Sequence, residues 1–217
     1  MLNTLECLRQ VHQRIKPSSY FEIGVREGGS LALSGCQSIG VDPAFNILKG
    51  VKCPVSLYRM TSDEFFEKHG NELKERNATF DLALIDGYHN FDFALRDFIN
   101  LEKYTSKSSL ILMDDVLPRN ASEAVLKPSG GAWAGDVWRI VACLQEFRSD
   151  LELIPIVTSP CGLLVIRNLD SNSTLLKDNY PEILKKYQDE SLYSYPGMEA
   201  LIELYGFKTI DYISQVL

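Results

Sequence analysis

Hydrophobic positions recur along this chain in two different periods. Short runs of strand-forming residues predict strands, at 20–23, 37–41, 55–59, 80–85, 109–113, 151–157 and 161–167. Longer stretches with apolar residues three or four positions apart predict helices, at 3–15, 61–73, 91–99, 135–148, 175–189 and 198–205. The runs at 80–85 and 109–113 are almost continuously apolar, which is typical of parallel strands buried on both faces.

The order of these segments predicts a doubly wound, mostly parallel α/β sheet of seven strands, because strands and helices alternate up to residue 148. Only residues 158–160 separate the last two strands, which favours a hairpin and an antiparallel edge. We expect a single domain over 1–217, with an N-terminal helix (1–16), a core (17–169) and a helical appendage (170–217). The appendage either lines a substrate pocket or contacts a second subunit. The sequence therefore leaves undecided whether the protein forms a homo-oligomer.

The N-terminal helix is predicted with Asn3 as its N-cap, in a capping box with Glu6, and with Pro17 as its stop. Its apolar stripe has helical spacing and consists of Leu5, Leu8, Val11 and Ile15. His12 lies outside this stripe, and we expect it to be solvated. The helix at 91–99 is expected to take its cap from Asn90 or Asp92.

Composition and charge narrow the function classes. The net charge of −7 argues against nucleic acid and anionic membranes as partners, because phosphate binding needs a basic surface. No window approaches the roughly 20 apolar residues that span a bilayer, and the first residues lack the apolar core of a signal peptide. The 5 cysteines are scattered without a C-x-x-C pair. We therefore expect a cytoplasmic protein with reduced thiols.

The segment 20–42 carries the first chemical signal: a strand, a glycine turn, a brief helix and a second strand that ends in Asp42. Gly24 lets the chain turn, and Gly28 with Gly29 lets a ligand approach the backbone. Amides at the start of the helix at Ser30 would face that ligand. Asp42, at the tip of the second strand, is suited to hold the two hydroxyls of a ribose.

This segment has three possible interpretations: a dinucleotide-binding turn, a methyltransferase motif, or a turn that binds nothing. A dinucleotide site needs G-x-G-x-x-G, but Arg26 replaces the second glycine. The spacing E-x-G-x-x-x-G, with Glu22 before Gly24, resembles the first motif of class I S-adenosylmethionine-dependent methyltransferases. That resemblance implies that Glu22 lies near the amino-acid end of the cofactor and that Asp42 binds the ribose. An ordinary tight turn that binds nothing remains the alternative.

Polar residues recur at the carboxyl ends of the predicted strands, the edge where doubly wound sheets bind ligands. They are Glu22, Asp42, Ser62, Asp86, Asp114 and Asp115. By the same resemblance Ser62 lies near the adenine, although a hydroxyl there can equally cap a helix.

The acidic residues Asp86, Asp114 and Asp115 follow two neighbouring strands, and their charges repel unless protons or a cation neutralise them. Oxygen ligands suit Mg²⁺, and Ca²⁺ or Mn²⁺ fit the same donors. If the strand continued through Asp115, only one of the adjacent pair could be a ligand, because successive side chains alternate. The alternative is that these aspartates cap helices or turns without metal.

His89 lies three residues past Asp86, beyond a glycine, so both can face one cleft. A neutral histidine is a suitable general base for a hydroxyl, and a metal on the same hydroxyl would lower its pKa. The alternative is that His89 only hydrogen-bonds Asp86 and stiffens the loop; the sequence leaves both roles open.

The resemblance extends over residues 19–167, through FEIGVREGGS, IGVDP, LALIDGYHNFDFALRDF and SLILMDDV. These segments are similar to the class I group that includes metal-dependent O-methyltransferases of sugars and macrolide antibiotics, with D-G-x-H the most specific piece. The resemblance implies Asp86, Asp114 and Asp115 as Mg²⁺ ligands and His89 as base. It implies contacts to S-adenosylmethionine from Glu22, Gly24, Val25, Gly28, Ser30, Asp42, Ser62 and Asp86. The sequence departs from the group at Arg26 and in its short first helix.

The sequence therefore predicts a Mg²⁺-dependent S-adenosylmethionine O-methyltransferase acting on a small hydroxylated molecule such as a sugar or natural product. Trp133, in the long loop 116–134, would form a lid over that acceptor or belong to the core. The alternatives are an NAD-dependent oxidoreductase on a Rossmann fold and a non-catalytic binding protein of the same fold.

Overall fold

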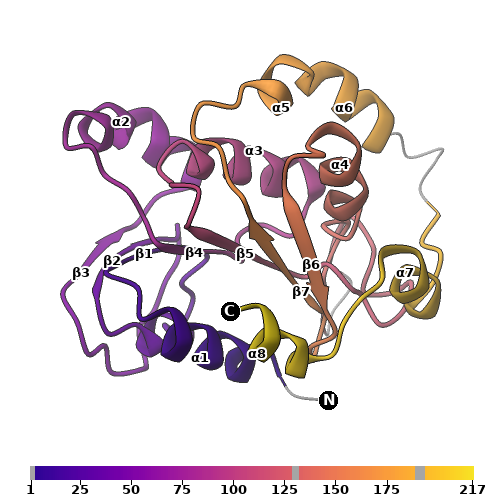
Figure 1. Ribbon diagram of the computed structural model, residues 1–217, viewed down its shortest axis with the longest axis horizontal. Helices are drawn as coiled ribbons and strands as arrows, with labels where there is room; N and C mark the ends of the chain where they lie inside the picture. Colours follow the sequence, from indigo (N-terminus) through magenta and orange to yellow (C-terminus); the bar gives the residue numbers. More distant parts are fainter. Residues whose placement is uncertain (1–2, 129–131, 189–193) are drawn as a thin grey trace.

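The computed structural model describes residues 3–128, 132–188 and 194–217. Seven strands form one sheet in the order β3-β2-β1-β4-β5-β7-β6 (Figure 1). Five neighbouring strands are parallel: β1 (Ser19–Ile23), β2 (Gln37–Val41), β3 (Val55–Tyr58), β4 (Leu82–Ile85) and β5 (Leu110–Asp114). β7 (Leu163–Arg167) runs antiparallel between β5 and β6 (Glu152–Ile156). The predicted sheet, with its antiparallel hairpin, is confirmed.

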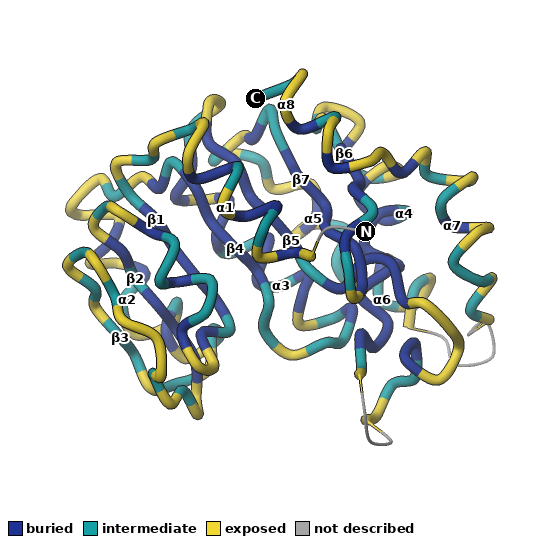
Figure 2. The backbone as a smooth tube through the Cα atoms, turned by 90° about the horizontal axis from the view of Figure 1, so that it is seen from below, coloured by how far each residue is buried: buried dark blue, intermediate teal, exposed yellow. Residues whose placement is uncertain are grey.

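Helices cover both faces of this sheet (Figure 1). On one face lie α2 (Ser62–Glu75), α3 (Phe91–Glu102) and α4 (Arg139–Phe147). On the other lie α1 (Thr4–Ile15), the short 3₁₀ helix η1 (Leu31–Leu33) and the C-terminal α8 (Ile213–Val216). Alternate residues of β4 enter the two cores, Ala83 on the α3 side and Leu84 on the α1 side. β4 and β5 are accordingly dark blue in the burial view of Figure 2.

His12 on α1 corrects one expectation, because it is buried and only 7% exposed. Its ring meets Tyr20 edge-on with centroids 4.8 Å apart. The helix turns Leu8, Val11 and His12 inward and leaves Leu5 43% exposed. The buried stripe is therefore rotated away from the one that the hydrophobic spacing indicated. The cap at Asn3 is as expected, since Glu6 N–H donates to Asn3 Oδ1 at 2.8 Å.

The N-terminus of α3 is capped from a distance, and neither Asn90 nor Asp92 supplies the bond that we expected. Asp136 Oδ1 accepts from Phe91 N–H at 2.7 Å, whereas Asn90 makes no side-chain cap bond. Asp136 belongs to the turns before α4, which begins at Arg139 rather than at residue 135. This contact fixes the loop between β4 and α3, which carries His89, against the segment that precedes α4.

The C-terminal appendage covers both faces at the β6 end of the sheet. It contains α5 (Leu175–Asp178), α6 (Tyr180–Tyr187) and α7 (Met198–Tyr205), whose inward residues join the α3-side core. The chain then runs past β6, where Ile156 bridges Lys208, into η3 (Ile210–Tyr212) and α8. The sequence pattern missed these last two elements. Within the described residues, no helix has both the length and the apolar character to cross a bilayer.

Candidate active site

The carboxyl ends of β1 and β4 meet at Gly24, and this contact organises the site. Asp86 N–H donates to the Ile23 carbonyl oxygen at 2.9 Å. Gly24 has φ +89°, and a Cβ there would lie 1.7 Å from the Asp86 carbonyl oxygen. Only glycine fits this approach. The turns after the two strands are therefore packed backbone to backbone.

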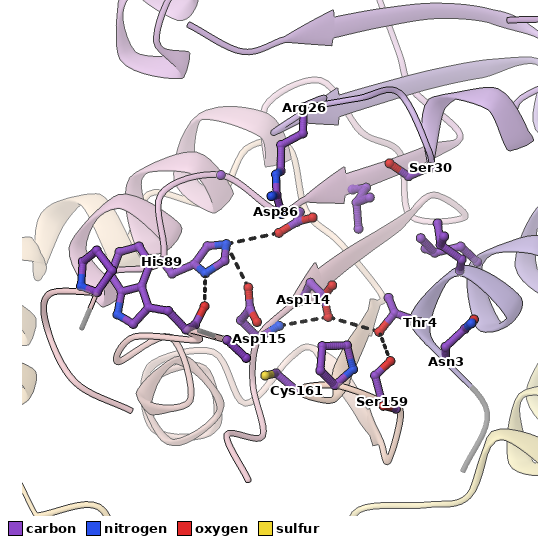
Figure 3. Close-up of a pocket in the computed structure, with 18 residues that line it drawn as sticks. Asn3, Thr4, Arg26, Ser30, Asp86, His89, Asp114, Asp115, Ser159 and Cys161 are labelled. Carbon is purple, nitrogen blue, oxygen red and sulfur yellow. Dashed lines mark hydrogen bonds and ion pairs between the residues drawn. The ribbon is translucent and has the colours of Figure 1, made fainter. Parts of the chain in front are cut away.

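Two cavities open along this edge of the sheet. The smaller, of about 310 Å³, is lined by residues between 23 and 97, including Gly24, Asp42, Ser62, Asp86 and Asp97. The larger, of about 680 Å³, adds the start of α1, the β6–β7 hairpin and the polar residues Ser30, His89, Asp114 and Asp115 (Figure 3). Arg26, Asp86 and Gly87 line both cavities. A ligand that spans the two must pass these three residues.

Asp42 in the smaller cavity is held rigidly at the tip of β2. Its Oδ2 accepts from Arg26 N–H at 2.8 Å and its Oδ1 from Ala44 N–H at 2.6 Å. The carboxylate keeps free lone pairs because each oxygen can accept twice. It can therefore still accept hydrogen bonds from ligand hydroxyls.

The smaller cavity also contains Asp97, a residue that sequence reasoning missed. Asp97 is 3% exposed and is hydrogen-bonded with Ser62. Burial raises the pKa of Asp97 to about 7, and the Ser62 hydrogen bond opposes this shift. The available signal was an acid on the inward face of α3, between the core residues Ala94 and Leu101.

Glu22 lies behind the cavity walls and is fully buried. Its Oε1 accepts from the Ser30 hydroxyl at 2.6 Å and its Oε2 from the Tyr20 hydroxyl at 2.7 Å. Burial raises the pKa of Glu22 to about 8 despite these bonds. Within the described part of the chain, Glu22, Val25 and Gly28 line neither cavity. Glu22 instead orients Ser30, which does line the larger one.

His89 is the centre of a compact polar cluster (Figure 3). Its Nε2 lies 3.0 Å from Asp115 Oδ2 and 3.4 Å from Asp86 Oδ1. Its Nδ1 lies 2.6 Å from the Trp133 carbonyl oxygen, so Nδ1 carries a proton and donates it there. A Cβ on Gly135 would lie 1.6 Å from the His89 carbonyl oxygen. The imidazole is therefore fixed from two sides, with Nε2 directed at the two carboxylates.

The charges of this cluster favour a bound proton or cation. Burial lowers the pKa of His89, but the hydrogen bond with Asp86 and the charges of Asp115 and Asp86 outweigh it and raise that pKa to about 9. Burial raises the pKa of Asp115 to about 7. One ligand atom from each of Asp86, His89 and Asp115 lies within 4.8 Å of the others. The two carboxylates fit a divalent cation of the Mg²⁺ or Mn²⁺ type, with the imidazole next to it.

Asp114, the third expected metal ligand, does not join this group. β5 ends at Asp114, and Asp115 takes a left-handed backbone with φ 67°, so the two carboxylates diverge. Asp114 Oδ1 accepts from Asp115 N–H at 3.0 Å and from the Thr4 hydroxyl at 3.5 Å. Burial and the charge of Asp115 raise the pKa of Asp114 well above its usual range. Thr4 also meets the Thr158 hydroxyl at 3.0 Å, which ties α1 to the hairpin.

Trp133 belongs to the wall of the larger cavity. Its indole N–H donates to the Val125 carbonyl oxygen at 2.6 Å, and its ring stacks on His89 with centroids 5.1 Å apart. The expected lid is not tested by this, because residues 129–131 of the loop lie outside the described residues.

Comparison with known proteins agrees with this geometry. Residues 21–116, from β1 to just past β5, match the family described as "Methyltransferase domain". No curated protein matches the chain. One similar solved structure is an O-methyltransferase from Bacillus cereus in complex with S-adenosylhomocysteine (SAH). It is 15% identical with TM-score 0.54, and the match covers 76% of this chain and 81% of that one. TomG, an O-methyltransferase of tomaymycin synthesis from Streptomyces achromogenes in complex with S-adenosylmethionine, is 15% identical with TM-score 0.52, covering 76% and 79%.

A third similar structure is the SAH-bound methyltransferase PaMTH1 of Podospora anserina, at 16% identity and TM-score 0.51, covering 78% of this chain and 80% of that one. At such identities the likeness concerns the fold, and the family match concerns residues 21–116. The family match covers less than half of the chain, and the structural likeness shows that the chain has the fold of these methyltransferase structures.

Proposed function

We propose that this protein transfers a methyl group from S-adenosylmethionine to a hydroxyl of a small molecule, with a divalent cation held by Asp86 and Asp115 beside His89. The observation that supports this most is the pair of cavities joined at Asp86 and Gly87. A nucleoside in the smaller cavity places its 5′ substituent at this junction. The transferable methyl group then faces the larger cavity, where His89 lies.

The smaller cavity suits the adenosine. Asp42 is fixed where the ribose hydroxyls would lie, and the polar pair of Ser62 and Asp97 lies farther along the same cavity. Ser30, oriented by Glu22, lies on the side of the larger cavity and would meet the amino-acid end. Together with Asp42 at the ribose, these residues would contact the cofactor along its whole length.

Asp86 and Asp115 would hold the cation, with His89 beside them. Asp114 would act through its bonds to Thr4 and Asp115, rather than as a direct ligand. A bound cation supplies charge that lowers the pKa of an acceptor hydroxyl. His89 keeps one proton on Nδ1 for the Trp133 carbonyl oxygen, so Nε2 would take the hydroxyl proton. A cation on the two carboxylates would oppose the charges that raise the pKa of His89, and would so leave Nε2 free to accept that proton. The cavity walls hold the hydroxyl oxygen in line with the methyl group.

Calorimetric titration with SAH, with and without Mg²⁺ or Mn²⁺, tests this function. We expect micromolar SAH binding and methyl transfer that EDTA abolishes and added cation restores. Failure to bind SAH in any condition would contradict the proposal, above all if NAD bound instead. Methyl transfer that persists in EDTA would overturn the cation alone.

A further inference from the structure

Arg26 lies in the turn after β1, in a backbone conformation that residues with a Cβ rarely adopt. Its φ is 46°. Arg26 N–H donates to Asp42 Oδ2 at 2.8 Å, and Asn46 N–H donates to the Arg26 carbonyl oxygen at 2.8 Å. Glycine adopts this conformation without steric cost. The chain therefore carries a long cationic side chain at a position where the backbone alone favours glycine.

The guanidinium of Arg26 also stands apart in its contacts. Within the described residues it makes no hydrogen bond or ion pair. The guanidinium of every other arginine contacts either a carboxylate or a backbone carbonyl oxygen. These arginines are Arg9, Arg14, Arg59, Arg76, Arg96, Arg119, Arg139, Arg148 and Arg167. The charge of Arg26 acts on Asp115 through space. A backbone position that favours glycine and a guanidinium without a hydrogen-bonded or ion-paired partner among the described residues together indicate a ligand contact rather than a role in folding.

The position of Arg26 between the two cavities indicates which ligand group it contacts. Arg26 is exposed, lines both cavities, and reaches toward Asp86 at their junction (Figure 3). Beyond the junction the larger cavity is acidic, with Asp114 and Asp115 in its wall. An ammonium or a sulfonium is compatible with such a wall, but a carboxylate needs a cation of its own.

We propose that Arg26 binds the α-carboxylate of the cofactor's amino-acid end where the cofactor passes from the smaller to the larger cavity. The planar guanidinium matches a carboxylate with two parallel hydrogen bonds. The acidic wall then faces the ammonium and sulfonium groups of the same molecule. This inference rests on the proposed function, because it concerns the same cofactor.

The test is a thermodynamic cycle with two ligands. SAH and its decarboxylated analogue, which keeps the amine but lacks the carboxylate, are titrated into the wild type, Arg26→Gln and Arg26→Gly. We expect both variants to weaken SAH binding by about ten- to a hundredfold, as for a hydrogen-bonded charged group. Binding of the decarboxylated analogue should change by less than about twofold, since it has no carboxylate to lose. Arg26→Gly matters here because glycine suits φ 46°, so the fold is retained.

Arg76→Gln is the matched control, because Arg76 is exposed on α2 and pairs only with Glu72. It should leave both affinities unchanged. An equal loss for both ligands, or no loss for SAH, would overturn the role of Arg26 while the proposed function stands. Failure of the wild type to bind either ligand would overturn the proposed function and this inference together.

Discussion

His89 meets neighbours through both ring nitrogens, and this decides which atom is available for chemistry. Nδ1 is bound to the Trp133 carbonyl oxygen, while Nε2 faces Asp86 and Asp115. The same carbonyl oxygen that blocks Nδ1 also fixes the ring plane, with the Trp133 indole stacked on it. The site thus exposes one nitrogen in one orientation.

Replacing His89 by Ala should lower turnover by about 10²–10⁴, the usual contribution of a general base. SAH affinity should stay within about twofold, because His89 does not line the cavity proposed for the adenosine and is not among the groups proposed to bind the amino-acid end. The measurement is SAH release with an acceptor found by screening. His69→Ala is the control, since His69 packs against Tyr58 and Phe65 on α2. Wild-type turnover in His89→Ala would rule out this role.

Substitutions of the adjacent Asp114 and Asp115 should differ in their effect on cation binding. Asp115→Asn removes a carboxylate of the cluster, whereas Asp114→Asn changes a group bonded to Thr4 and the backbone. We expect Asp115→Asn to weaken Mn²⁺ binding at least about tenfold more than Asp114→Asn, because affinity follows the charge of the direct ligands. Calorimetry with Mn²⁺ alone measures this. Equal losses would instead place both carboxylates on the cation.

His12 makes stability depend on pH. Burial lowers the pKa of His12 from 6.5 to about 4. Between these values the unfolded chain binds the proton that the folded chain excludes, so the contribution is present above pH 6.5 and is lost as pH falls toward 4. From pH 7 to pH 5 the loss is about 2 kcal/mol. His12→Phe, which keeps a ring beside Tyr20, should remove it. Urea unfolding of both proteins at the two pH values measures the difference, and an unchanged pH dependence would contradict it.

At the scale of elements, α3 depends on a cap from a distant segment. Asp136 is 2% exposed and accepts from Phe91 N–H, so it joins the start of α3 to the turns before α4. Because the loop with His89 ends at this helix start, the cap also holds that loop in place. Stability and site geometry are coupled here through one carboxylate.

Asp136→Ala should lower the free energy of unfolding by about 1–2 kcal/mol, the range for loss of an N-cap. Asn90→Ala, one residue before the helix, should cost much less, because Asn90 makes no cap bond. Urea denaturation of both variants gives the comparison. If Asn90→Ala cost more than Asp136→Ala, the cap would lie with Asn90 after all.

The sequence predicts the residues at the ends of the strands, but it does not predict the contacts between distant segments that complete the site. Gly24, Asp42 and Asp86 follow directly from local patterns, since each comes at the end of an apolar run. The bonds from Asp136 to Phe91 and from Thr4 to Asp114 join residues 45 and 110 positions apart. No periodicity encodes such contacts. The divergence of Asp114 and Asp115 likewise depends on the backbone φ of one residue, which the strand pattern leaves undetermined.

At the scale of the whole molecule, a cofactor that binds only the folded protein would stabilise it against unfolding. At 100 times its dissociation constant, SAH should raise the free energy of unfolding by about 2.7 kcal/mol. Thermal unfolding with increasing SAH measures this rise, and NAD at equal concentration is the control. A shift with NAD but none with SAH would point to the oxidoreductase alternative.

The two cavities draw on different parts of the chain. Residues between 23 and 97 line the smaller cavity, whereas Asn3–Leu8 and Ser159–Cys161 complete the larger one (Figure 2 views the molecule from the α1 side). Under the proposed function, mutations that reshape the acceptor side would therefore fall at positions outside the cavity proposed for the nucleoside. Such a division would let acceptor preference drift during evolution while the methyl donor is retained, and it would mark α1 and the hairpin as the segments to vary in a library.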